Sequence, residues 1–169
     1  MGQKTPTCHQ YMGLDVGGTK VEAVLVDLNH QVLCHLVRPM DTSSGEQSIE
    51  SISRAVASVL ADPAASKGKL CAIGMGIPGS VDSPRVNLAV NLNLKNAPLG
   101  EIISNRFGVP VVLENDVRIA ALGVYSSLRE KMPVCNLAYL SIGTGIAAGM
   151  IINGQLYRGS HGMAGELGH

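Results

Sequence analysis

Two distant parts of this chain repeat the same order of an apolar run, a glycine-rich turn and a second apolar run. The turns lie at 17–19 and 143–145, and the β-branched and aliphatic residues on either side are typical of strands. Short glycine-rich turns join neighbouring antiparallel strands. The repetition therefore predicts a duplicated unit, with one copy in each half of the chain. The four runs cover residues 11–16, 21–27, 136–142 and 146–152.

Between the two units, helix and strand patterns alternate. Ser44, with Gln47 three residues later, forms a capping pattern, and apolar residues at helical spacing follow it as far as Asp62. The run 70–77 is apolar apart from its glycines and is typical of a central parallel strand. The stretch 82–98 is rich in Asn and Pro with little periodicity, so we expect an irregular loop there. Further helices are expected at 99–107 and 116–129, and further strands at 31–37 and 109–114.

This alternation predicts the α/β fold class. We expect a disordered start at 1–10, an N-terminal α/β domain at 11–130 and the beginning of a second domain at 131–169. A hairpin cannot bury its own apolar face, so we expect the second domain to be truncated in this sequence.

Charge and hydropathy limit the ligands that the chain is expected to bind. Its 13 basic residues balance 13 acidic ones, which argues against nucleic acid or a membrane surface as a partner. No apolar run reaches the roughly 18 residues that span a bilayer, and the first residues lack the apolar core of a signal peptide. The four cysteines are widely scattered, which favours buried thiols over disulfides or a metal knuckle. We therefore expect a cytoplasmic protein with a small-molecule ligand.

The two glycine-rich turns offer backbone amides and hydroxyl groups that suit phosphate binding. Asp15 precedes the first turn, where its carboxylate could hold a hydrated Mg²⁺. Either turn alone is better explained as a simple hairpin, but two such turns could clamp one triphosphate. Neither matches the P-loop or the dinucleotide-binding fingerprint, because no helix follows the turn. The candidate nucleotide-binding residues are Asp15, Gly17, Gly18, Thr19, Lys20, Gly143, Thr144 and Gly145.

Asn115 and Asp116 lie where an apolar strand is expected to meet a helix. The carboxyl ends of strands are where α/β proteins bind their ligands. Asp116 could accept the proton of a sugar hydroxyl that attacks a phosphate, and Asn115 could orient that sugar. Alternatively, either side chain only caps the helix, and the residues themselves leave both interpretations open.

Glu166 and His169 lie three residues apart in a glycine-rich segment. A carboxylate, an imidazole and loop amides could together match the donors and acceptors of a sugar. His169 could instead bind a metal, but this sequence has no second ligand at metal-site spacing. An exposed pair without a function is the third possibility.

Five segments in this order resemble the ROK family of sugar kinases, related repressors and uncharacterised members. The segments are LDVGGTK at 14–20, GIPGSVD at 76–82, ENDVRIAALG at 114–123, LSIGTGIAAG at 140–149 and GELGH at 165–169. The resemblance implies an actin-like ATPase fold, related to ribonuclease H, with the first lobe followed by the start of the second. It also implies ATP and Mg²⁺ between the lobes and a hexose on the first lobe.

The resemblance assigns roles to individual residues. Asp116 matches the catalytic base, and the first turn with Asp15 and Thr144 matches positions at the phosphates and the metal. In many members the His of the last motif also binds a structural zinc ion with three downstream cysteines. Zinc is therefore implied at His169 only for a longer form, and the adenine pocket is also expected downstream. The positions that match sugar contacts are Gly79, Asn91, Asn115, Asp116, Glu166 and His169.

The implied activity is ATP-dependent phosphorylation of glucose or an N-acetylhexosamine by a glucokinase-like enzyme, a homo-oligomer when full length. We expect the 169-residue chain itself to be inactive. One alternative is a sugar-sensing transcriptional regulator, which would need a DNA-binding winged helix ahead of 14–20. Another is a sugar-binding member without catalysis. The chain departs from the family pattern in lacking a Trp near 91–95 and in carrying Val117-Arg118-Ile119 in place of smaller residues.

Overall fold

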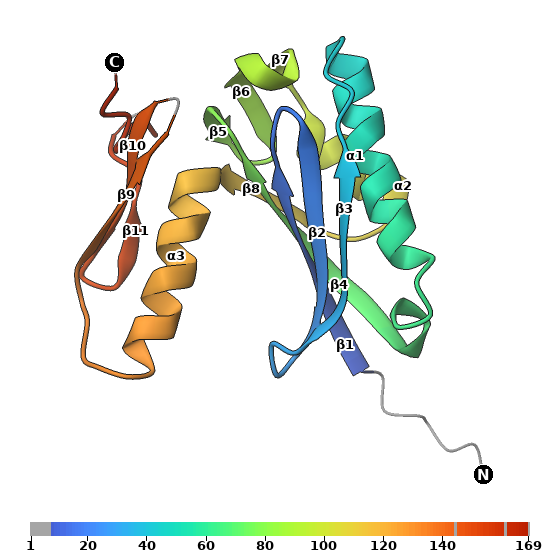
Figure 1. The fold of residues 1–169 in the computed structure, drawn as a ribbon, viewed down its shortest axis with the longest axis horizontal. Helices are drawn as coiled ribbons and strands as arrows, with labels where there is room; N and C mark the ends of the chain where they lie inside the picture. The colour runs from blue at the N-terminus through green and yellow to red at the C-terminus, as the bar shows by residue number, and fades with distance from the viewer. Residues whose placement is uncertain (1–7, 144, 161, 169) are drawn as a thin grey trace.

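The computed structural model describes residues 8–143, 145–160 and 162–168 and confirms the predicted α/β class (Figure 1). The main sheet consists of β1 (Cys8–Val16), β2 (Lys20–Asp27), β3 (Val32–Pro39), β4 (Gly68–Ile77) and β8 (Val111–Asn115). The first three strands form an antiparallel meander, and β4 and β8 run parallel to β1. The order across the sheet is β3-β2-β1-β4-β8. The expected central parallel strand is therefore confirmed in β4.

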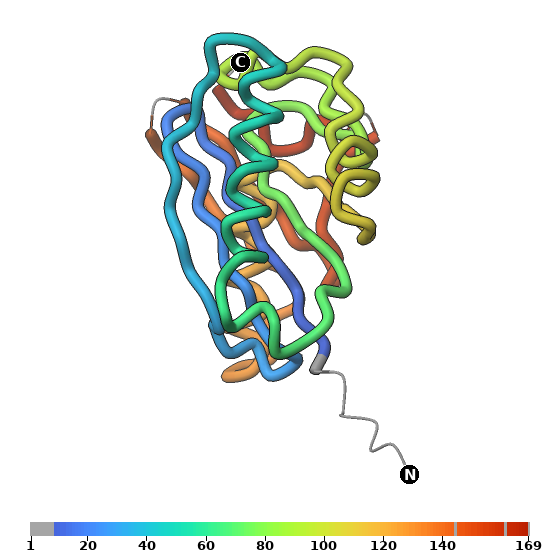
Figure 2. Tube along the Cα trace, turned by 90° about the vertical axis from the view of Figure 1, so that its right-hand side faces the viewer, coloured from blue at the N-terminus to red at the C-terminus, as the bar shows by residue number. Residues whose placement is uncertain are grey.

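Three helices cover the main sheet: α1 (Gly45–Leu60), α2 (Leu99–Phe107) and α3 (Asp116–Arg129). Figure 2 shows α1 and α2 together in front of the strands, and Figure 1 shows α3 on the opposite face. The predicted cap is confirmed, since the Ser44 hydroxyl accepts a hydrogen bond from the backbone N–H of Gln47 at 3.2 Å. Two 3₁₀ helices also occur, η1 (Ala65–Lys67) and η2 (Val90–Leu92). No helix in the described ranges has the length and apolar character to cross a membrane.

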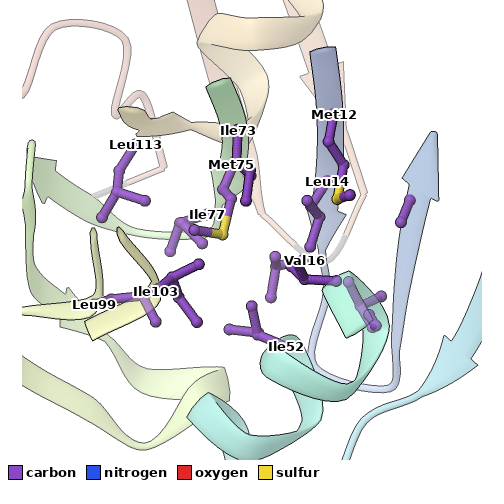
Figure 3. Packing of buried hydrophobic residues seen from close by; sticks show 14 of the residues in the cluster. Met12, Leu14, Val16, Ile52, Ile73, Met75, Ile77, Leu99, Ile103 and Leu113 are labelled. Atoms are coloured by element: carbon purple, nitrogen blue, oxygen red, sulfur yellow. The ribbon is translucent and has the colours of Figure 1, made fainter. Parts of the chain in front are cut away.

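The main core lies between the sheet and the pair α1 and α2. Alternate residues of β1 and β4 point into it, and Figure 3 shows Ile52, Leu99 and Ile103 of the helices facing them. On the opposite face of β4, the absence of a side chain at Gly76 leaves room for the start of α3. The buried strand residues of the main core that Figure 3 labels are Met12, Leu14, Val16, Ile73, Met75, Ile77 and Leu113.

The expected disordered start is wrong for residues 8–10. These residues belong to β1 and pair with β4, in a register that places Cys8 opposite Gly68. Gln10 is only 1% exposed, and its side-chain amide donates to the carbonyl oxygen of Ala64 at 2.9 Å. A polar residue takes part in a buried strand here because its amide is satisfied by a backbone group outside the sheet.

The expected irregular loop at 82–98 is also wrong. The segment folds into most of a small antiparallel sheet in which Val81, Val86 and Leu94 are buried. The strands are only three to five residues long, and Asn and Pro residues lie within and between them, so no alternation is visible in the sequence. They are β5 (Ser80–Asp82), β6 (Arg85–Ala89) and β7 (Leu94–Ala97).

A second meander follows α3 and repeats the strand order of β1, β2 and β3. Its strands are β9 (Leu137–Ile142), β10 (Ile146–Ile152) and β11 (Gln155–Tyr157). Asn153 and Gly154 have φ values of 51° and 78°, which confirms the predicted two-residue hairpin. Helix α3 packs closely on this sheet, since a Cβ atom at Gly149 would lie 2.5 Å from the Cβ of Ala121. It therefore lies between the two sheets (Figure 1).

Candidate active site

Asp15 and Asp116 line the same cavity of about 380 Å³. In the register of the main sheet, Asp15 of β1 is level with Gly76 of β4, and Gly76 is level with Glu114 of β8. Gly76 has no side chain between them, and α3 begins at Asp116 directly above it, where a Cβ on Gly76 would lie 3.5 Å from the Cα of Asp116. Strand β9 closes the cavity with Tyr139. The fold thus brings two carboxylates together, one from strand β1 and one from the first residue of helix α3.

The two carboxylates make this cavity electrostatically negative. Burial raises the pKa of Asp15 above its usual value, and the charges of Asp116 and Glu22 raise it further, against a smaller opposing effect of Lys20. Carboxylate oxygens are the ligands that Mg²⁺ prefers, and a cation would relieve this repulsion. Among the described residues, no cluster of three or more His, Cys, Asp or Glu could hold a metal. Mg²⁺ is octahedral and is usually bound by one or two carboxylates, with water or phosphate oxygens as its further ligands, and the pair of Asp15 and Asp116 fits an ion of this kind.

Asp15→Asn is expected to raise the melting temperature slightly at neutral pH. Because folding raises the pKa of Asp15, the ionised carboxylate opposes folding, and the free energy of unfolding should increase as the pH falls through that pKa. Repulsion of this kind near the surface lowers the free energy of unfolding by only a few tenths of a kcal/mol, which corresponds to about 1 °C in melting temperature. The substitution should also abolish a stabilisation of the wild type by MgCl₂, measured by thermal unfolding.

The exposed Asp82 provides the matched control for that measurement. Asp82→Asn removes one carboxylate from a different part of the surface and should leave the magnesium-dependent shift intact. An equal response of wild type and Asp15→Asn to MgCl₂ would contradict a metal-binding role for Asp15.

A second cavity, of about 430 Å³, brings together three of the predicted sugar-binding residues. Gly79 follows β4, Asn91 lies in η2 and Glu166 comes from the segment after β11. The first glycine-rich turn is a close neighbour, since a Cβ at Gly18 would lie 3.3 Å from the carbonyl oxygen of Asn91. The proposed sugar and phosphate residues therefore lie next to each other. The remaining lining residues are Pro78, Ser80, Leu88, Val90, Gly162 and Met163.

Asn115 contacts both α3 and the Gly79 loop. Its side-chain oxygen accepts from the N–H of Arg118 at 3.1 Å, so it caps α3, and its amide nitrogen donates to the carbonyl oxygen of Gly79 at 3.1 Å. A carboxylate oxygen of Asp116 accepts from the N–H of Val117 at 2.8 Å. The capping alternative is therefore observed for Asn115, which also fixes the loop at the second cavity.

Most of the remaining predicted residues lie in the two turns at 17–19 and 143–145. Each turn is closed by a backbone hydrogen bond, from Gly17 N–H to the carbonyl of Lys20 and from Gly143 N–H to the carbonyl of Gly145, both at 2.9 Å. Figure 1 shows that β1 in the main sheet and β9 in the sheet of β9, β10 and β11 end at the same end of the molecule, where the two turns follow them. The Lys20 ammonium pairs with Glu22 at 3.4 Å and lines neither cavity. Thr144 and His169 lie outside the described residues, so their roles, and zinc binding with them, stay predictions.

A buried ion-pair network that was not predicted from the sequence lies beside Asp116. Glu114 and Arg118 are 8% and 3% exposed, and their side chains pair at 3.3 Å. Arg158 binds the other carboxylate oxygen of Glu114 at 2.7 Å. The signal available in the sequence was an Arg four residues after a Glu at the end of an apolar strand. A larger cavity of about 500 Å³, between β3 and α1, contains no predicted site residue.

The chain is similar to known proteins over most of its length. The model of the ROK family matches residues 11–169. A glucokinase of Streptomyces coelicolor and a putative xylose repressor of a Caldicellulosiruptor species are each 36% identical over 94% of the chain. The chain covers 48% and 40% of these relatives, so it spans about half the length of the curated relatives it matches or less.

A solved structure confirms the predicted actin-like ATPase fold. The crystal structure of a ROK family glucokinase from Streptomyces griseus, in complex with glucose and AMPPNP, matches with a TM-score of 0.80 at 33% identity. The match covers 95% of this chain and 50% of that chain.

Proposed function

This chain belongs to the ROK family, and on that premise we propose that the protein phosphorylates a hexose with ATP, with Asp116 as the general base. The observation that carries the proposal is the position of Asp116. It is the first residue of α3, directly after β8, and lines the same cavity as Asp15. A base beside a second carboxylate that suits Mg²⁺ is the arrangement that phosphoryl transfer to an alcohol requires.

In this proposal the second cavity holds the sugar. Glu166 and Asn91 offer hydrogen-bond partners for sugar hydroxyl groups, and Asn115 keeps the Gly79 loop in place. Asp116 accepts the proton of the hydroxyl group whose oxygen attacks the γ-phosphate. Asp15 would hold Mg²⁺, which neutralises charge on the phosphates when bound, and the amides of the two turns would contact phosphate oxygens.

Glucose is the first candidate for the sugar, because the matching glucokinase structure contains glucose and an ATP analogue. An N-acetylhexosamine is the second. A sugar-responsive repressor remains the alternative function, and the observation in its favour is the equal identity to the glucokinase and to the putative xylose repressor. The Asp15 and Asp116 pair favours the kinase, because sensing a sugar requires no base and no metal.

The test measures ADP release by the full-length protein with ATP, Mg²⁺ and a panel of glucose, N-acetylglucosamine, N-acetylmannosamine and xylose. Calorimetry on the same panel measures sugar binding separately. We expect one hexose to be bound and to stimulate ADP release. Binding of xylose without ADP release for any sugar would contradict the kinase and favour the repressor.

A further inference from the structure

The segment that carries Glu166 is held against the first domain by one side chain from α3. In this segment, 158–166, the described residues 158–160 and 162–166 form no helix or strand, and Gly162, Met163 and Glu166 line the second cavity. Arg118 reaches across from α3, and its Nη2 donates to the carbonyl oxygens of Gly162 at 2.5 Å and Ala164 at 3.1 Å. The two carbonyls flank Met163, and the second lies two residues before Glu166. The guanidinium therefore fixes the backbone of the cavity wall.

Arg118 is itself held by a buried carboxylate. One oxygen of Glu114 accepts from Arg118 Nη1 at 3.3 Å and from the backbone N–H of Asn115 at 2.9 Å. The other oxygen accepts from Arg158 Nε at 2.7 Å, and Arg158 belongs to the same segment. Glu114 thus connects β8 to the segment twice, through Arg118 and through Arg158. The planar guanidinium directs Nη1 at the carboxylate and Nη2 at both carbonyls, whereas an ammonium group has its three N–H donors on a single nitrogen and does not reproduce this geometry.

We propose that Arg118 is a positioning residue that sets the location of Glu166 in the sugar cavity and so controls the affinity for the sugar. The inference rests on the proposed sugar-binding function. Three consecutive residues where β8 meets α3 then have separate tasks: Glu114 anchors the 158–166 segment, Asn115 holds the Gly79 loop and Asp116 lines the cavity with Asp15. Both walls of the sugar cavity are thereby fixed relative to the proposed base.

Arg118→Lys in the full-length protein is the first test. The variant keeps the positive charge beside Glu114, but it cannot also hold both carbonyl groups. We expect the KM for the sugar, and its dissociation constant by calorimetry, to rise about 10- to 100-fold. The KM for ATP should stay within about twofold, and kcat should fall far less than the sugar affinity. A purely structural role would lower the melting temperature and the yield without this selective effect on the sugar.

Arg158→Gln is the second test, and it remains informative if Arg118→Lys fails to fold. The Arg158 side chain is 58% exposed, so its loss leaves no buried positive charge unpaired. We expect a smaller rise in the dissociation constant for the sugar, about three- to tenfold. Arg54→Lys is the matched control, because Arg54 pairs with Glu50 on the exposed surface of α1 at 3.5 Å. It should leave the sugar affinity unchanged.

The outcomes separate this inference from the proposed function. Sugar affinities of Arg118→Lys and Arg158→Gln within twofold of wild type, with both variants folded, would overturn the role of Arg118. Sugar binding by wild type without ADP release would overturn the kinase but leave the calorimetric test of Arg118 valid. Failure of the wild type to bind any sugar would overturn both.

Discussion

Asp116→Asn should lower the kcat of the full-length protein by about 10²- to 10⁴-fold, because an amide cannot accept the proton of the attacking hydroxyl group. The fold should survive the change. Asn is nearly isosteric with Asp, its side-chain oxygen can still accept from the N–H of Val117, and Asn115 still caps α3. The dissociation constant for the sugar should stay within a few-fold of wild type. The experiment compares kcat by ADP release with sugar affinity by calorimetry.

The exposed Glu46 of α1 gives a matched control for this prediction. Glu46→Gln removes a carboxylate that lines neither cavity and should leave kcat unchanged. Unchanged turnover in Asp116→Asn would exclude Asp116 as the base. Loss of sugar binding together with turnover would instead indicate that Asp116 mainly binds the sugar. The two measurements therefore distinguish a general base from a binding residue at the same position.

The helices were predicted well because their start signals are local. Ser44 and Gln47 interact within one turn, and α2 occupies residues 99–107 as expected from its periodicity. The glycine-rich turns were also recognised correctly as hairpins, because their geometry depends on a few neighbouring residues. Structure that is determined within about one helical turn or one hairpin is readable from a single sequence.

The small sheet β5-β6-β7 could not be predicted because its strands are stabilised by contacts across the fold rather than by their own pattern. The Ser48 hydroxyl of α1, for example, donates to the carbonyl oxygen of Leu92, 44 residues away, at 2.6 Å. The motifs identified Asp15 and Asp116 as candidates, but only the folded chain, with Gly76 between them, shows that they line the same cavity.

The network of Glu114, Arg118 and Arg158 lies beyond sequence reasoning for the same reason. Arg158 is 44 residues from Glu114 in the chain and 2.7 Å from it in space. In the sequence, Arg118 stood out only as a departure from the smaller residues of the family pattern. Its function follows from the two carbonyl groups that it binds, and no periodicity or motif predicts those contacts.

Gly79→Ala should destabilise the protein by about 2–4 kcal/mol and lower its melting temperature by about 5–15 °C. Gly79 has a φ of 103°, which residues with a side chain rarely adopt, and an added Cβ would lie 2.3 Å from the carbonyl oxygen of Leu88. The loop must therefore move or the small sheet must shift. Either movement disturbs the hydrogen bond from Asn115 to the carbonyl of Gly79. We expect sugar affinity to fall at least tenfold as well.

Gly74→Ala is the matched control, because it adds the same methyl group to the same strand-and-loop region. Gly74 lies in β4, and a Cβ built there has no heavy atom within 4 Å. The melting temperature of the Gly74→Ala variant should equal or slightly exceed that of wild type, since Ala suits a strand better than Gly. If Gly79→Ala has the same melting temperature as Gly74→Ala, the loop can accommodate a side chain and the predicted destabilisation is wrong. A loss of sugar affinity without loss of stability would mean that Gly79 is needed at the cavity wall, where the sugar approaches the backbone, more than for the fold.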